Sequence, residues 1–227
     1  MMAEPQEVLK FEIKPEEKIL SANNTIPIWD KDSPKDQKYN ELIMSLYNMI
    51  RMKDVKTANH CKAVAYYSNG IAAALGFSKA DIHAINDAAL LHDIGKILVD
   101  QSILNKNGKL TDRERYQMED HTEDGMRILE SFHVDDRVVD AAWHHHERID
   151  GSGYPDGLYD SDILEFTKII AVADMTDAMS TNRPYRNKLS FDTVISELKK
   201  ASGKQTDKKY TDIMIELLVT DQIYLMG

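Results

Sequence analysis

The sequence predicts an all-α fold. Apolar residues recur at helical spacing along most of the chain, Ser or Thr residues followed by acids mark several helix starts, and two-residue alternation is not sustained anywhere. A chain of 227 residues with 42% hydrophobic residues can bury one sizeable core without covalent cross-links. We therefore expect one helical bundle with an appended N-terminal arm.

The N-terminal segment differs in composition from the remainder. Residues 1–38 contain four of the six prolines and little periodicity. We expect residues 1–50 to form a largely irregular arm or small appended element, and residues 51–227 to form the main domain. A helical pattern begins at Tyr39, after which apolar residues follow at three- and four-residue spacing: Leu42, Ile43, Leu46, Met49 and Ile50.

The following segments carry start and stop residues typical of helices. A stripe of small and apolar residues closes at Gly76, because glycine is typical of helix ends. Ser78 opens the next helix, which we expect to end at Gly95. Thr111 opens another helix, which we expect to reach His121.

The C-terminal half continues the helical pattern. Asp135 or Asp136 can cap a helix, and a glycine-rich loop follows over residues 151–157. Residues 169–179 are apolar and small, apart from two acids, and Ser190 caps a further helix.

The net charge and the cysteine content limit the functions that this protein can have. A net charge of −10 does not favour binding of polymeric nucleic acid, which requires a basic surface. The single cysteine, Cys61, excludes an intrachain disulfide and fits a reducing, cytoplasmic setting. No apolar run approaches the ~20 residues of a membrane span, and the first ten residues do not have the pattern of a secretory leader.

Several histidines stand beside acids near predicted helix ends. His92 directly precedes Asp93, His145 and His146 are adjacent, and Asp174 lies in an otherwise apolar segment. A buried acid is costly unless it is paired or bound to a cation. Imidazole and carboxylate donors together suit first-row transition metals, whereas zinc ribbons and iron–sulfur sites need several thiolates. The pattern therefore predicts a metal centre.

The adjacent pair His92–Asp93 favours two ions over one. Neighbouring helical side chains differ by roughly 100° in direction, so both cannot simply face one ion. The two carboxylate oxygens of Asp93 could instead bridge two metals while His92 binds one of them. Two metals ~3.5–4 Å apart can generate hydroxide from water and stabilise an in-line phosphoryl displacement. This chemistry suits phosphodiester hydrolysis.

Three segments are distinctive in their order: residues 92–96 (HDIGK), residues 145–155 (HHERIDGSGYP) and residues 183–186 (RPYR). Together they resemble the HD-GYP branch of the HD superfamily of metal-dependent phosphohydrolases, from about Arg51 to the C-terminus. The resemblance implies an HD-type helical bundle over residues 51–227. It also implies a cytoplasmic signalling enzyme, a cyclic di-GMP phosphodiesterase that yields linear pGpG and, in some members, GMP.

The resemblance implies a role for each matched residue. The metal ligands would be His60, His92, Asp93, His121, His145, His146 and Asp174. Asp93 would bridge two divalent transition ions, Fe or Mn, since these ligand types accept both. His60, His92 and Asp174 would complete one ion, and His121, His145 and His146 the other.

Catalysis and substrate binding are assigned in the same way. Asp93 and Lys96 would act in catalysis, and the substrate would be held by Lys96, Tyr154, Arg183 and Arg186. Arginine suits this task because its planar fork forms paired bonds with phosphate or guanine edges. We expect Asp177 to orient a ligand or a loop. For His83, His133 and His144 we expect structural roles.

The same resemblance reveals one difference from the family pattern and implies one protein partner. Some members bind a third metal through a glutamate four residues before the first histidine, where this chain has Lys56. We therefore expect two metals and a reaction that stops at the linear dinucleotide. In the family, the GYP loop is also linked to docking of GGDEF-domain proteins.

Other functions stay open at this point. A catalytically weak cyclic-dinucleotide receptor or GGDEF-partner module is disfavoured because all seven ligand positions are filled. Another HD-superfamily enzyme, such as a nucleotidase or (p)ppGpp hydrolase, has no need of the GYP and RPYR segments. A general nucleic-acid binder lacks its basic, aromatic stripe.

Overall fold

The computed structural model describes residues 34–182 and 187–226. This part of the chain contains helices, turns and two isolated β-bridges, so the predicted all-α class is confirmed. The α-helices are α1 (Pro34–Lys53), α2 (Val55–Ala74), α3 (Lys79–Leu91), α4 (Gln101–Leu104), α5 (Asp112–Glu119), α6 (His121–Ser131), α7 (Asp136–His144), α8 (Glu165–Ser180), α9 (Phe191–Ala201) and α10 (Lys208–Val219). Two short 3₁₀ helices are η1 (Ile94–Ile97) and η2 (Asp160–Asp162).

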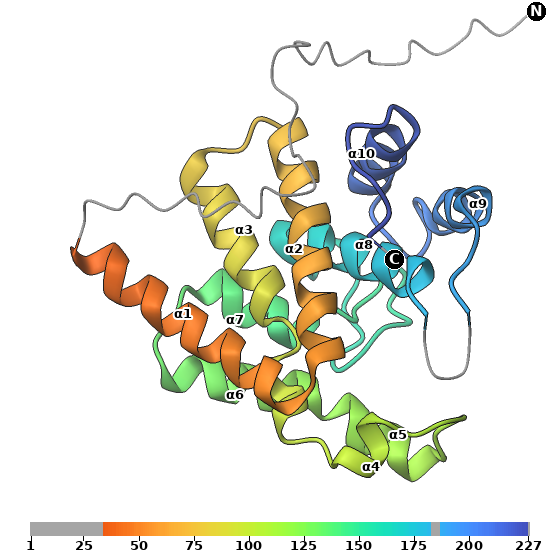
Figure 1. Cartoon of the computed structure of the whole chain (residues 1–227). Helices are drawn as coiled ribbons and strands as arrows, with labels where there is room; N and C mark the ends of the chain where they lie inside the picture. Colours follow the sequence, from red (N-terminus) through yellow and green to blue (C-terminus); the bar gives the residue numbers. More distant parts are fainter. Residues whose placement is uncertain (1–33, 183–186, 227) are drawn as a thin grey trace, which may run out of the picture.

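Helix α2 lies at the centre of the bundle (Figure 1), where it packs against α1, α3, α8 and α10. Its small residues let these neighbours come close. A Cβ added to Gly70 would stand only 3.3 Å from Ile223 Cγ2. The buried hydroxyl of Tyr67 accepts a hydrogen bond from the backbone N–H of Met226 at 2.7 Å, which fixes the C-terminal tail on α2.

The predicted start and stop residues are confirmed for the first helices. Gly76 adopts φ +70° directly after α2, in the left-handed region that favours glycine. Ser78 caps α3, since its hydroxyl accepts from the backbone N–H of Asp81. Thr111 and Glu114 form a complete capping box at the start of α5.

The same holds in the second half of the chain. Asp135 caps α7 by accepting from the N–H of Arg137, and Ser190 caps α9 by accepting from the N–H of Thr193. Each cap satisfies one of the backbone donors that the first helical turn leaves open.

The prediction that Gly95 ends a helix was wrong. Helix α3 ends at Leu91, and Gly95 lies inside η1. The glycine is required for another reason: a Cβ added there would stand 1.9 Å from the carbonyl oxygen of His121 and 2.6 Å from the N of Gly125. Gly95 therefore allows the start of α6 to approach η1.

The prediction of one helix from Thr111 to His121 was also wrong. Helix α5 ends at Glu119, and His121 is the first residue of α6. Backbone hydrogen bonds at Asp120 continue from one helix to the next, so the chain bends there without unwinding fully. The bend places His121 at a helix start.

Helix α1 begins at Pro34, earlier than the pattern at Tyr39 predicts, and proline is favoured in the first helical turn. Ile43, Leu46 and Ile50 of this helix are buried in the core. The division into two regions at residue 50 stays a prediction, and most of the arm lies outside the described residues. Within the described part, no helix combines the length and apolar character needed to cross a bilayer.

Candidate metal centre

The predicted ligand residues come from five separate segments and meet at one place in the bundle. His60 lies on α2, His92 and Asp93 follow α3, His121 starts α6, His145 and His146 follow α7, and Asp174 lies on α8. Five of these seven side chains are buried, and His60 and His146 are partly exposed. The close packing of these helices, not proximity in sequence, forms the cluster.

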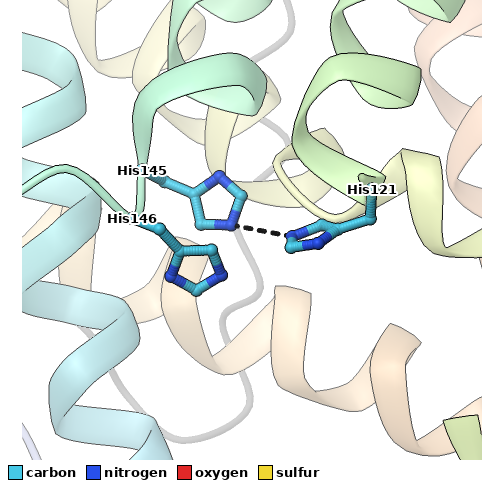
Figure 2. Close-up of side chains that lie close together, drawn as sticks. All are labelled: His121, His145 and His146. Atoms are coloured by element: carbon cyan, nitrogen blue, oxygen red, sulfur yellow. Dashed lines mark hydrogen bonds between the residues drawn. The ribbon is translucent and has the colours of Figure 1, made fainter. Parts of the chain in front are cut away.

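One half of the cluster consists of three histidines. His121, His145 and His146 each offer a ring nitrogen, and these nitrogens lie within 4.8 Å of one another. Figure 2 shows the rings turned toward a common space, with His121 Nε2 and His145 Nε2 3.3 Å apart. Helix α7 ends at His144, so the adjacent pair lies in a turn and both rings can face the same way.

The other half consists of His60, His92 and Asp174, whose potential ligand atoms also lie within 4.8 Å of one another. His60 Nε2 is 3.1 Å from Asp174 Oδ1. The rings of His60 and His92 meet edge to face, with centroids 5.3 Å apart.

Asp93 lies between the two halves. Its Oδ2 is 3.5 Å from His92 Nε2 and 3.7 Å from His60 Nε2. Its Oδ1 is 3.3 Å from His121 Nε2 and 3.7 Å from His145 Nε2. Each carboxylate oxygen therefore faces a different half of the cluster, which is the arrangement that a bridging ligand needs.

Backbone carbonyls fix the tautomers of three histidines. The Nδ1 atoms of His92 and His121 lie 2.7 and 2.5 Å from the carbonyl oxygens of Ala89 and Met118. The Nδ1 of His145 is 3.1 Å from two such oxygens. A carbonyl only accepts, so each Nδ1 carries a proton and Nε2 is the ring nitrogen directed toward the cluster. The Nε2 atoms of His121 and His145 face each other, an arrangement that a cation would stabilise.

His60 is oriented by an acid instead. Its Nδ1 is 2.6 Å from Asp177 Oδ2, which leaves Nε2 for the cluster. Asp177 thus orients the ring of His60, a predicted ligand, and carboxylates behind metal-binding histidines commonly have this role. Burial alone would lower the pKa of His60, but the hydrogen bonds to Asp174 and Asp177 outweigh burial and raise it to about 9.

The two acids of the cluster are charged. Burial would raise the pKa of Asp93, but Lys96 and the imidazoles of His92 and His121 hold it well below its usual range. Lys96 Nζ donates to Asp93 Oδ2 at 2.6 Å. For Asp174, His60 likewise outweighs burial and lowers the pKa.

Three further donors stay neutral. Burial lowers the pKa of His92, His145 and His146, so these rings are unprotonated and able to bind metal. Cys61 also lies close to His92 and Asp93. Burial raises the pKa of its thiol well above the usual range.

The residues fit a metal centre by a further criterion. His92 Nε2 and Asp93 Oδ1 are buried and make no hydrogen bond within the described part of the chain. Buried polar atoms without partners are costly and rare. Both atoms point into the space between the two halves, where a cation would satisfy them.

The GYP loop lies against the cluster. The ring of Tyr154 is 4.7 Å from the ring of His146, centroid to centroid. No role was predicted for Glu147, whose buried carboxylate accepts hydrogen bonds from three backbone N–H groups of this loop. The only indication in the sequence was an acid next to the histidine pair, four residues before the glycine-rich loop. Arg183 and Arg186 lie outside the described residues, so their role stays a prediction.

Two of the histidines outside the cluster have identifiable surroundings. His144 Nδ1 is 2.7 Å from Asp140 Oδ1, and its Nε2 is 3.2 Å from Asp156 Oδ2. Burial would lower the pKa of His144, but the hydrogen bond to Asp140 and the one to Asp156 raise it. His133 is exposed at the end of α6, with φ 54°. Neither residue belongs to the metal cluster.

The model of the HD domain family matches residues 44–210 of this chain. The chain belongs to the HD domain family. Among curated proteins, it is 37% identical over 178 residues to a cyclic di-GMP phosphodiesterase of Thermotoga maritima, covering 77% of this chain and 48% of that protein. It is 38% identical over 164 residues to 3'3'-cGAMP-specific phosphodiesterase 3 of Vibrio cholerae, covering 72% of this chain and 36% of that protein.

Solved structures support the same fold. An HD-GYP-type protein of Bdellovibrio bacteriovorus superposes with a TM-score of 0.60 at 20% identity, covering 80% of this chain and 60% of that chain. The phosphodiesterase PgpH HD domain of L. monocytogenes in complex with cyclic-di-AMP gives 0.58 at 18% identity, covering 78% and 94%. The predicted HD-type helical fold is thereby confirmed. The chain spans about half or less of the length of these curated relatives.

Proposed function

We propose that this protein is a metal-dependent cyclic-dinucleotide phosphodiesterase that hydrolyses cyclic di-GMP to linear pGpG. The observation that carries the proposal is the position of Asp93 between two groups of inward-facing metal-binding side chains. Relatives at 37% and 38% identity act on cyclic di-GMP and on 3'3'-cGAMP, which favours a cyclic dinucleotide as the substrate class.

The proposed ligand assignment is supported by the short distances within each half of the cluster. Asp93 would bridge two divalent ions. One ion would be completed by His60, His92 and Asp174, and the other by His121, His145 and His146. When bound, such a pair supplies the positive charge that neutralises a phosphate and acidifies a water molecule. Iron or manganese fits a site built from imidazole and carboxylate alone.

The other residues act on the substrate. Lys96 places its ammonium group beside Asp93, at the edge of the cluster, where it can contact a phosphate oxygen. Tyr154 lies over His146 and can pack against the dinucleotide. Arg183 and Arg186 are proposed to hold its phosphates or guanines, on the basis of the RPYR segment alone.

The test is anaerobic purification with metal analysis, followed by turnover assays with identification of the product. We expect two equivalents of Fe or Mn per chain and release of pGpG from cyclic di-GMP. Parallel assays with 3'3'-cGAMP and cyclic di-AMP define the substrate. A metal-loaded protein that binds cyclic di-GMP but never cleaves it would instead favour the receptor alternative.

Two further proposals concern a protein partner and the location in the cell. The GYP loop exposes Ser152, Pro155 and Tyr159, which leaves it accessible to a GGDEF-domain protein. Co-purification with such a domain, compared between wild type and a Pro155→Ala variant, tests this partner. A cytoplasmic location is supported by the use of a single, buried cysteine, and fractionation of cells tests it.

A further inference from the structure

Glu147 is a buried acid at the junction between the metal cluster and the GYP loop. It directly follows His146, and only 2% of its surface is exposed. Its carboxylate oxygens face no cation in the described part of the chain. A buried carboxylate is tolerated only where donors surround it, so its partners identify its purpose.

Those partners are three consecutive backbone N–H groups of the loop. Glu147 Oε1 accepts from Asp156 N at 2.7 Å and from Gly157 N at 3.0 Å, and Oε2 accepts from Leu158 N at 3.0 Å. Hydrogen bonds to a charged acceptor are the stronger kind. One side chain therefore holds the returning end of the loop against the turn that carries His145 and His146.

The first part of the GYP loop is held against the same turn that carries His145 and His146. A Cβ added to Gly153 would stand 2.4 Å from Glu147 Cα and 2.5 Å from the carbonyl oxygen of His146. Gly153 thus lies directly on the ligand-bearing turn. Tyr154 follows it, and its ring lies over His146. The loop segment that carries Tyr154 is held between Gly153 and the three N–H groups bonded to Glu147.

We propose that Glu147 is a positioning residue that holds Tyr154 in place over the metal cluster and thereby sets the affinity for the cyclic dinucleotide. This inference rests on the proposed function, since it assigns Glu147 a role in that reaction. Glu147 does not contact the reacting atoms. It acts through the loop, so its loss is expected to weaken substrate binding and to leave the metal ligands intact.

The experiment compares Glu147→Ala and Glu147→Gln with wild type in the metal-loaded protein. Losing charge-assisted bonds reduces the fraction of molecules with an ordered loop, so Glu147→Ala is expected to raise KM for cyclic di-GMP about tenfold or more. Metal content and kcat are expected to change little. The amide oxygen of Glu147→Gln can still accept from Asp156 and Gly157, so this variant is expected to recover most of the affinity.

Two controls separate positioning from general damage. Turnover of bis(p-nitrophenyl) phosphate, a small diester that needs the metals but not the loop, is expected to stay near wild type in Glu147→Ala. Asp156→Ala removes only the contact of its exposed carboxylate with His144 and keeps the backbone N–H, so its KM is expected to stay within about twofold of wild type.

A double-mutant cycle with Tyr154→Ala identifies the route of the effect. If Glu147 acts through Tyr154, the effects on KM are not additive, and Glu147→Ala adds little in the Tyr154→Ala background. Additive effects, an unchanged KM in Glu147→Ala, or loss of bound metal in that variant would each overturn the inference. A wild type without turnover of cyclic di-GMP would instead contradict the proposed function itself.

Discussion

Asp87 and Asp93 are both almost fully buried and lie six residues apart, yet their surroundings produce opposite charge states. Asp93 is surrounded by Lys96 and imidazoles, which keep its pKa well below the usual range. Asp87 has no ion pair with a described residue: burial raises its pKa to about 7, a hydrogen bond from Asn86 opposes this, and nearby Asp135 adds to it. Burial alone therefore does not make an acid functional. Asp93 differs from Asp87 because the ammonium group of Lys96 and several imidazole nitrogens lie beside its carboxylate.

The largest effect is expected for Asp93→Ala. This variant removes the side chain that, within residues 34–182 and 187–226, faces both halves of the cluster, and it leaves Lys96 without this partner. We expect both ions to be lost or disordered and hydrolysis of cyclic di-GMP to be abolished. Metal analysis and a turnover assay check this, with Asp87→Asn as the matched control that keeps both. Full activity in Asp93→Ala would refute the bridging role.

Asp87→Asn is expected to change stability instead of activity. The folded-state pKa of Asp87, about 7, lies above the usual value of 3.8, so the folded protein binds the extra proton between these values. Stability from this group is present below about pH 4 and is lost as the pH rises through 7. At about pH 8.5 the variant should exceed wild type by on the order of 3 kcal/mol in free energy of unfolding, since one pKa unit corresponds to ~1.36 kcal/mol.

Denaturant titrations of both proteins at several pH values between 5 and 8.5 measure this difference. The metal cluster contributes equally to both proteins, so the gap between the two curves isolates Asp87. Curves that stay parallel over the whole range would show that Asp87 is already charged in the folded protein.

Gly95→Ala tests the approach of η1 to α6, which places His121 beside Asp93. The added Cβ would collide with the backbone at His121 and Gly125, so the two segments must separate. We expect a loss of about 2 kcal/mol in free energy of unfolding, together with reduced metal binding. Gly125→Ala is the matched control, because its Cβ would meet its nearest neighbour at 3.4 Å. Equal losses in the two variants would contradict the explanation.

The smallest effect is expected for Asp177→Asn. The amide keeps the shape but weakens the bond to His60 Nδ1. Loss of such an orienting partner typically lowers metal affinity by ~10–100-fold. Competition with a chelator measures the affinity, and unfolding experiments should show little change. An unaltered affinity would mean that packing alone orients His60.

The sequence predicted the helical class, most of the caps and the two-sided cluster around Asp93, because these features depend on local spacing or on motifs with a fixed order. The predictions were wrong where packing between segments distant in sequence determines the structure. Gly95 looked like a helix end because glycine is common there, whereas its requirement is the approach of α6. The partners His60 and Asp177 are 117 residues apart, and only Asp177's general orienting role was foreseen. Nothing in the local sequence distinguishes the buried Asp87 from an exposed helix residue.

Backbone carbonyls accept hydrogen bonds from the Nδ1 atoms of His92, His121 and His145, and these bonds affect metal binding. These hydrogen bonds hold the three rings in one orientation, so the rings need not reorient when an ion binds. Metal binding would therefore cost these three side chains little rotamer entropy, which favours retention of the ions.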